Sequence, residues 1–206
     1  MASTEKLALR HFKKVDPLLF GRAKKARLEP LSPRKPSEYF TSLCKEIIGQ
    51  QLSGKVAKAI FKRFKGVFPG NRITVAGALK LTEKQLRSTG MSWSKAGFIK
   101  DLAGKVASKQ VNLKGLAKLG DQEVASELSK VKGIGPWTCE MFLMFTLGRE
   151  DVFSHGDLGL KKAISNLYSI ENPSREVVEK LSAKWSPYRT YACLALWNAV
   201  DAEAWG

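Results

Sequence analysis

Two aspartates, Asp151 and Asp157, stand in the segment DVFSHGDLGL, and Asp157 is the better placed for chemistry. The apolar residues that follow it have helical spacing, so we expect Asp157 at a helix N-terminus. That position favours an ionised carboxylate, which can stabilise developing positive charge or orient a water molecule. The alternative is a simple N-cap. We therefore predict Asp157 as the catalytic candidate, Asp151 as structural, and His155 as a loop or phosphate-contact residue.

A glycine-rich turn upstream could bind an anion. Lys132-Gly133-Ile134-Gly135 interrupts a helical pattern in which Leu128 and Val131 share a face, and Pro136 can open the next helix. Glycine costs a helix interior about 1 kcal/mol, so two glycines predict a turn. The N–H groups of the second helix would then point outward, where an anion fits. Because the chain has 35 Lys and Arg against 19 Asp and Glu, that anion is most simply a DNA phosphate. A simple connector is the alternative.

At this spacing, the two motifs resemble the helix-hairpin-helix (HhH-GPD) DNA glycosylase superfamily. Gly133 to Thr138, and Val152-Phe153 through Gly156 to Gly159, are most similar to its DNA-3-methyladenine glycosylase II branch. The resemblance implies an all-α fold of two lobes with the active-site cleft between them. It also implies a monofunctional enzyme of base excision repair that flips alkylated purines such as 3-methyladenine and hydrolyses the N-glycosidic bond, leaving an abasic site. Two alternatives stay open: a same-fold glycosylase for a deaminated or oxidised base, and a non-catalytic DNA binder. The carboxylate of Asp157 argues against a pure binder.

The resemblance assigns Trp137 and Trp197 to the base pocket, where cation–π contacts of roughly 0.5 to 2 kcal/mol favour a cationic base. Core packing is the alternative for each tryptophan. Met141 and Asn198 stand where relatives show further aromatic residues. Relatives that cut the strand carry a lysine where this chain has Trp137, so no lyase activity is expected.

A second DNA contact is expected between two helical patterns, at Gln50-Gln51-Leu52-Ser53. Glutamine is unusual at a seam of apolar helices, because buried amides need partners. The resemblance implies that this turn enters the minor groove, with Gln51 at the wedge position where the family often has a bulkier apolar residue. Ser53 can cap the second helix. An ordinary polar turn is the alternative.

Cofactors are expected to be few. The resemblance implies a possible Na⁺ or K⁺ on backbone carbonyls of the hairpin, namely Ser129, Val131 and Ile134. Relatives with an iron–sulfur cluster have four cysteines near the C-terminus, but here only Cys193 follows Asp157, so no cluster is expected. The three cysteines form no C-x-x-C pair, which predicts neither a disulfide framework nor a zinc site.

The charge balance suits a polyanionic partner. Lys and Arg exceed Asp and Glu by 35 − 19 = 16, which favours double-stranded DNA containing alkylated bases, although a solvated basic surface would give the same count. No apolar run is long enough to span a membrane, and the first residues lack an apolar signal core. We expect an intracellular monomer, nuclear in a eukaryote and cytoplasmic in a prokaryote.

Helical periodicity without strand-like alternation predicts an all-α chain. We expect an N-terminal helix and basic linker at 1–36 that pack with C-terminal helices at 151–206, and a central lobe at 37–150 containing the helix-hairpin-helix at 128–145. Gly21 to Pro36 is predicted as a surface linker. Caps are predicted at Thr82, paired with Gln85, and at Asp121. Three lysines are predicted to point outward from one helix: Lys95, Lys100 and Lys105.

Overall fold

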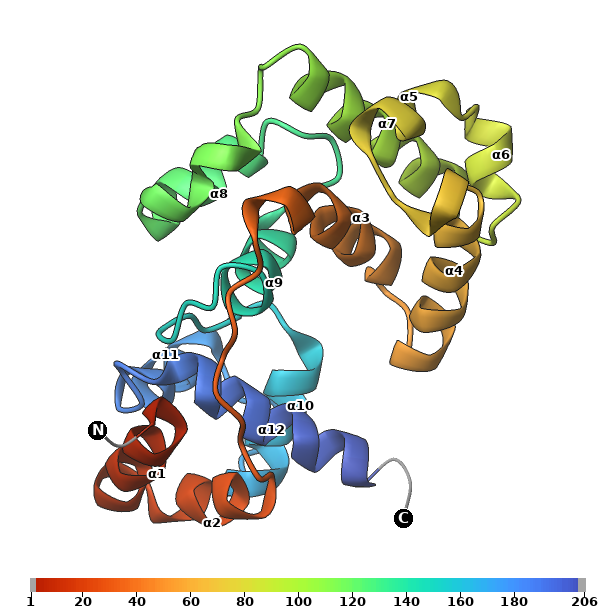
Figure 1. The fold of residues 1–206 in the computed structure, drawn as a ribbon. Helices are drawn as coiled ribbons and strands as arrows, with labels where there is room; N and C mark the ends of the chain where they lie inside the picture. Colours follow the sequence, from red (N-terminus) through yellow and green to blue (C-terminus); the bar gives the residue numbers. More distant parts are fainter. Residues whose placement is uncertain (1–2, 204–206) are drawn as a thin grey trace. The chain divides into compact units, whose positions relative to one another are not determined.

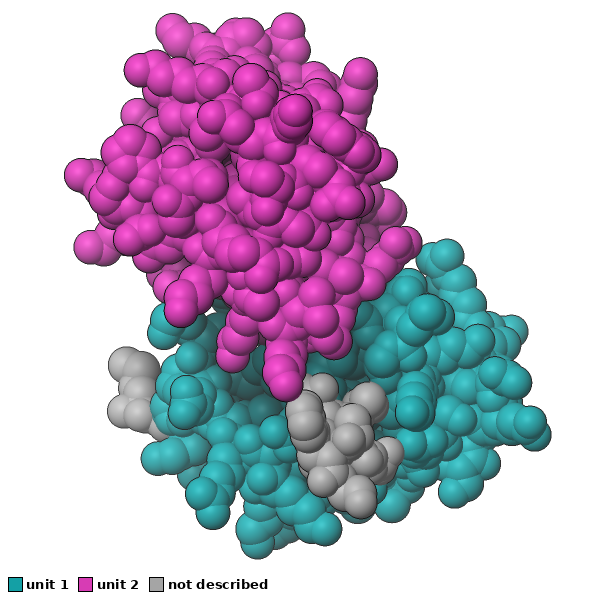
Figure 2. Space-filling model, turned by 90° about the vertical axis from the view of Figure 1, so that its right-hand side faces the viewer, with its two compact units in different colours: residues 1–32, 148–206 teal, residues 33–147 magenta. Residues whose placement is uncertain are grey.

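The computed structural model describes residues 3–203, and every regular element in that range is a helix (Figure 1). The all-α class is thereby confirmed. The chain divides into two compact units, shown in teal and magenta in Figure 2: unit 1 comprises residues 1–32 and 148–206, and unit 2 comprises residues 33–147. The predicted boundaries were 36/37 and 150/151. No helix within residues 3–203 is long and apolar enough to cross a membrane.

Unit 1 joins the two ends of the chain, with α2 lying beside α10 and α12 and α1 lying beside α2 (Figure 1). Its helices are α1 (Thr4–Val15), α2 (Pro17–Lys25), α10 (Leu158–Tyr168), α11 (Arg175–Ala183) and α12 (Arg189–Glu203). Asp16 is 6% exposed and connects these helices, because its carboxylate accepts hydrogen bonds from the Leu19 amide at 3.0 Å, from the Trp185 indole at 2.9 Å, and from the Tyr168 hydroxyl. A buried carboxylate with three donors fixes the register of the N-terminal and C-terminal segments.

The predicted linker at Gly21–Pro36 is wrong in its first part. Helix α2 continues to Lys25, and Ala23 is fully buried in unit 1. The buried face of α2 outweighs the local richness in Lys and Arg, because helix stability in proteins comes mainly from packing an apolar face.

Unit 2 is built around α3, α7 and α9, with buried apolar faces. Its helices are η1 (Pro36–Glu38), α3 (Tyr39–Gly49), α4 (Gly54–Gly66), η2 (Pro69–Asn71), α5 (Val75–Lys80), α6 (Glu83–Arg87), α7 (Trp93–Ala107), η3 (Leu113–Lys118), α8 (Asp121–Leu128) and α9 (Pro136–Phe145). The capping box at α6 is confirmed, since the Thr82 amide donates to Gln85 Oε1 at 2.8 Å and the Gln85 amide donates to Thr82 Oγ1 at 3.2 Å.

The predicted cap at Asp121 is wrong. Gly120 occupies the N-cap position in an extended conformation, and Asp121 is the first helical residue. The Glu123 carboxylate accepts the Gly120 amide at 2.8 Å. Glycine tolerates the N-cap position well, so the helix begins one residue earlier than a cap at Asp121 would place it.

The three lysines of α7 do not point outward as predicted. Lys95 donates to the carbonyls of Ile48 and Gln50, Lys100 donates to those of Ala78, Leu79 and Leu81, and Lys105 donates to that of Lys130. These carbonyls lie at or just beyond the C-terminal ends of α3, α5 and α8, where orphan acceptors and the negative end of the helix dipole attract a cation. Helix α7 therefore binds three other helix ends through its lysines.

Candidate active site and nucleic-acid interface

The hairpin lies in unit 2, between α8 and α9, and Pro136 begins α9 as predicted. Helix α8 ends at Leu128, so Val131 lies in the turn rather than on the helix, although both side chains are buried. The Ile134 amide donates to the Val131 carbonyl at 3.2 Å and closes a tight turn. Because the first-turn amides of α9 need acceptors from outside the helix, this end can bind an anion.

The two hairpin glycines have different roles. Gly133 has φ +78°, and a Cβ there would meet Phe98 Cδ2 at 2.1 Å. Gly135 has φ −106°, and a Cβ there would meet no atom within 4 Å. Gly133 is thus required by the turn itself. Gly135 leaves open space beside the helix start, as an approaching phosphate requires.

The turn between α3 and α4 is fastened to the hairpin through Gln50. Its side-chain Nε2 donates to the Gly133 carbonyl at 2.8 Å and to Thr138 Oγ1 at 2.9 Å. The next two residues are exposed: Gln51 has φ +56°, and the Leu52 side chain is 38% exposed. Of the two glutamines, Gln50 therefore has a structural partner, and Gln51 stays the candidate for DNA contact.

Ser53 occupies the predicted N-cap position of α4, but its side chain makes no capping hydrogen bond. The Ser53 backbone carbonyl accepts the first hydrogen bond of the helix, from the Ala57 amide at 2.9 Å. The exposed Ser53 hydroxyl thus does not stabilise the start of α4 and faces solvent together with Leu52.

In unit 1, Asp157 is the N-cap of α10. Its Oδ1 accepts the Leu160 amide at 2.9 Å and the Trp197 indole N–H at 3.1 Å. The side chain is half-buried, and the adjacent Leu158 is 80% exposed. Two donors orient one carboxylate oxygen at the N-terminus of a helix.

The segment before Asp157 is held by the start of α12. Thr190 Oγ1 accepts the Val152 amide at 3.1 Å and donates to the Arg149 carbonyl at 2.7 Å. Arg189 binds both carboxylate oxygens of Asp151, from Nε at 2.7 Å and from an Nη at 3.0 Å. Helix α12 thus positions Asp157 twice, through this anchor and through Trp197 further along the same helix.

Asp151 itself has the structural contacts that were predicted for it. Burial acts to raise its pKa, but hydrogen bonds from Arg189 and Ser186 and the charge of Arg189 outweigh burial, so that the pKa lies below its usual value. With both oxygens engaged in one ion pair, Asp151 serves to hold the segment rather than to receive a substrate.

Comparisons with known proteins agree with this geometry. The family described as HhH-GPD superfamily base excision DNA repair protein matches residues 44–187. The chain belongs to this superfamily. A putative DNA-3-methyladenine glycosylase of Bacillus subtilis is 31% identical over 169 residues, which is 79% of this chain and 59% of the Bacillus protein. The chain thus spans less than two thirds of that relative.

Two solved structures share the fold over nearly the whole chain. The crystal structure of a DNA-3-methyladenine glycosidase from Bacillus halodurans has a TM-score of 0.76 and 34% identity, and covers 94% of this chain and 90% of its own. A 3-methyladenine DNA glycosylase of Schizosaccharomyces pombe in complex with abasic DNA has a TM-score of 0.82 and 28% identity, with coverage of 94% and 96%. The fold recognised from the two sequence motifs is thereby confirmed.

The remaining site residues of the family pattern lie in both units. Trp137, in the first turn of α9, and Trp197, on α12, are half-buried, Met141 is 4% exposed, and Asn198 is exposed. The half-buried state of Trp137 and Trp197 means that part of each residue is accessible, which is compatible with a pocket residue. Their role in a base pocket stays a prediction.

His155 is half-buried in unit 1, where its ring packs edge-on against Phe153 at 4.9 Å between centroids. Burial is the main cause that lowers the pKa of His155 below its usual 6.5, and Arg175 and Arg189 act in the same direction against Glu179. The His155 Nε2 lies 3.4 Å from Ser182 Oγ. His155 lies in the loop before α10, as predicted, and its contact with a phosphate stays a prediction.

The carbonyls predicted to hold a monovalent cation fit that role chemically. Backbone carbonyls are the hard oxygen ligands that such ions need, and the carbonyl of Val131 has a second lone pair beyond the one used by the Ile134 amide. Among residues 3–203, no group of three or more His, Cys, Asp or Glu could hold a metal ion. The cation site stays a prediction.

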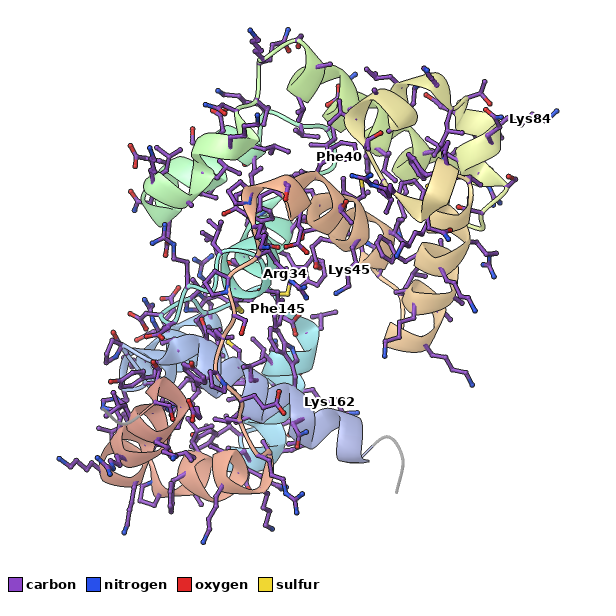
Figure 3. All side chains as sticks on the ribbon, viewed as in Figure 1. Arg34, Phe40, Lys45, Lys84, Phe145 and Lys162 are labelled. Carbon is purple, nitrogen blue, oxygen red and sulfur yellow. The ribbon has the colours of Figure 1, made fainter. Side chains whose placement is uncertain are left out.

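A cavity of about 320 Å³ in unit 2 was not predicted from the sequence. Figure 3 labels three of its lining residues: Arg34 before η1, Lys45 on α3 and Phe145 at the end of α9. Glu46 also lines it, and burial raises the pKa of the Glu46 carboxyl, opposed by the charge of Lys45. The Phe145 side chain is 37% exposed, and no local sequence pattern marks such a cavity.

Proposed function

We propose that the protein is a monofunctional DNA glycosylase that hydrolyses the N-glycosidic bond of alkylated purines of the 3-methyladenine type and leaves an abasic site. Asp157 carries the proposal, because its carboxylate is oriented by two donors at a helix N-terminus. The resemblance of its segment to the family's motif supports a catalytic role for it. The relatives named DNA-3-methyladenine glycosylase support the alkylation branch.

The two units supply different parts of the proposed site. Unit 2 supplies the hairpin and the turn at Gln51-Leu52, which we propose as the segments that hold the DNA backbone and enter the minor groove. Unit 1 supplies Asp157. The net charge of +16 supports a polyanionic substrate. A base inside a duplex is unreachable, so the target nucleotide must be extruded before it can react.

Asp157 would act through charge. As the bond between C1′ and the base nitrogen breaks, the bonding electrons leave with the base and the sugar becomes oxocarbenium-like. An ionised carboxylate beneath the sugar stabilises that charge and orients the water whose oxygen adds to C1′, and the water loses one proton to the carboxylate, from which it passes to solvent. A 3-methyladenine base is cationic in DNA and leaves as a neutral molecule, so little acid catalysis is needed.

The same reasoning supports hydrolysis without strand cleavage. A lyase needs an amine nucleophile to form a Schiff base with the sugar. Trp137 stands at the position where strand-cutting relatives carry that lysine, and its half-buried indole suits contact with an electron-poor base instead.

The test is incubation of the protein with duplex DNA treated with a methylating agent. We expect free 3-methyladenine in the supernatant, abasic sites in the DNA, and strand breaks only after alkali. Breaks before alkali, or a covalent adduct trapped by borohydride, would show a lyase. Release from duplexes with hypoxanthine or an oxidised purine, but not from methylated DNA, would favour another lesion. Binding without any release would favour a non-catalytic protein.

A further inference from the structure

The side-chain amide of Gln50 joins two segments that are far apart in sequence. Both of its N–H bonds are used, one on the Gly133 carbonyl at 2.8 Å and one on Thr138 Oγ1 at 2.9 Å. The Gly133 carbonyl can only accept, so the amide nitrogen must face it, and the orientation of the side chain is fixed. Gln50 thus connects the α3–α4 turn to the hairpin and to the first turn of α9.

The backbone of the same residue is held from α7. Lys95 Nζ donates to the Gln50 carbonyl at 2.6 Å and to the Ile48 carbonyl at 2.9 Å. Burial lowers the pKa of Lys95, as expected for an ammonium group that has left water to meet backbone acceptors. A half-buried lysine that meets two carbonyls at a helix end immobilises that end.

Helix α7 also contacts the hairpin. Phe98 packs where a Cβ of Gly133 would lie, and Asp101 Oδ2 accepts the Lys132 amide at 2.8 Å. Lys95, Phe98 and Asp101 are three residues apart along the helix, so they share one face. One face of α7 therefore contacts both segments that we propose to touch DNA.

We infer that Gln50 is a positioning residue that couples the exposed turn at Gln51-Leu52 to the hairpin. When this turn enters the duplex, the contacts between the hairpin and the DNA phosphates then hold it in place. This inference rests on the proposed function. A turn that enters the base stack has to separate stacked bases, and opening a base pair costs a few kcal/mol. The turn must therefore keep its conformation while it displaces the bases. A segment that is already held loses less conformational freedom on insertion than a free loop would.

The test compares two substrates that carry the same excisable purine. In the first, the lesion is fully paired; in the second, it lies in a short bubble where no stack has to be opened. Single-turnover excision is measured with saturating enzyme for wild type, Gln50→Glu and Lys95→Met. Gln50→Glu keeps the length of the side chain but removes both donors. Gln110→Ala and Lys114→Met, at exposed positions, control for loss of an amide and of a positive charge.

We expect both test variants to lose about tenfold in rate on the paired substrate and less than about threefold in the bubble, since small misplacements of site groups cost up to about 10²-fold. Thermal melting shows whether each variant is folded. The two control variants should have the same excision rates as wild type on both substrates. Equal losses on both substrates would assign Gln50 a merely structural or catalytic role. No loss on either would remove the coupling.

A second measurement separates this inference from the proposed function. A 2-aminopurine beside the lesion reports unstacking upon binding, without any excision. If wild type excises neither substrate, the proposed function fails, while a smaller fluorescence rise with Gln50→Glu than with wild type still supports the coupling. A fluorescence rise with Gln50→Glu that equals the rise with wild type would overturn the proposed coupling.

Discussion

Replacing Gly133 by alanine gives the sharpest structural test of the hairpin. The residue has φ +78°, and its new Cβ would lie 2.1 Å from Cδ2, 2.3 Å from Cε2 and 2.4 Å from Cγ of Phe98. The left-handed conformation costs a non-glycine residue about 1 to 2 kcal/mol. The overlap reaches Cγ at the base of the ring, so the whole ring must move, and such overpacking costs about 1 to 3 kcal/mol. We therefore expect Gly133→Ala to lower the free energy of unfolding by about 2 to 5 kcal/mol.

The assay is denaturant unfolding followed by tryptophan fluorescence, with native-state hydrogen exchange reporting on α8 and α9. Gly135→Ala is the matched control: its φ of −106° is ordinary and no atom lies within 4 Å, so it should cost less than about 1 kcal/mol. Its methyl group would, however, enter the open space where we propose that a phosphate binds, and it should therefore weaken DNA binding.

A double mutant separates strain from overlap. Phe98→Ala removes the ring, so in that background Gly133→Ala should cost only the backbone strain of about 1 to 2 kcal/mol. The reasoning is refuted if Gly133→Ala is as stable as wild type, or if its cost is the same with and without Phe98.

Two further predictions follow from unit 1. Asp151→Asn should lower the free energy of unfolding at pH 7 by about 1 to 2 kcal/mol, since the partly exposed ion pair with Arg189 is lost. Because the folded pKa lies below the usual 3.8, this contribution is present above that value and disappears as the pH falls through the folded pKa; urea unfolding of the two proteins should therefore converge in acid, and a constant difference down to pH 2 would contradict it. Trp197→Phe keeps an aromatic ring but removes the indole N–H that Asp157 accepts at 3.1 Å, so single-turnover excision should fall about tenfold while the dissociation constant for abasic DNA stays unchanged. A normal rate would limit Trp197 to packing.

Local sequence chemistry predicted the features that depend on few residues. The proline start of α9, the Thr82–Gln85 capping box and the N-cap role of Asp157 each need only neighbours in the chain. The pairing of two short motifs was enough to recognise the fold, because hairpin and aspartate occur at the family's spacing.

Long-range polar contacts were beyond prediction. The lysines of α7 looked like a solvated face, yet their ammonium groups meet carbonyls of helices that are distant in sequence. Gln50 and Gln51 are adjacent and chemically identical, and only the folded chain shows that Gln50 bonds to the hairpin while Gln51 is exposed. Periodicity reports which face is apolar, but it does not identify the partner of a polar side chain.

The central claim is that the charge of Asp157 drives excision, and Asp157→Asn tests it most directly. Asparagine is as good an N-cap as aspartate and can still accept the Leu160 amide, so the variant removes the charge and keeps the helix start. On methylated duplex DNA we predict that release of 3-methyladenine falls by at least about a hundredfold, while affinity for abasic DNA stays within about threefold of wild type. Equal release by the two proteins would contradict the account.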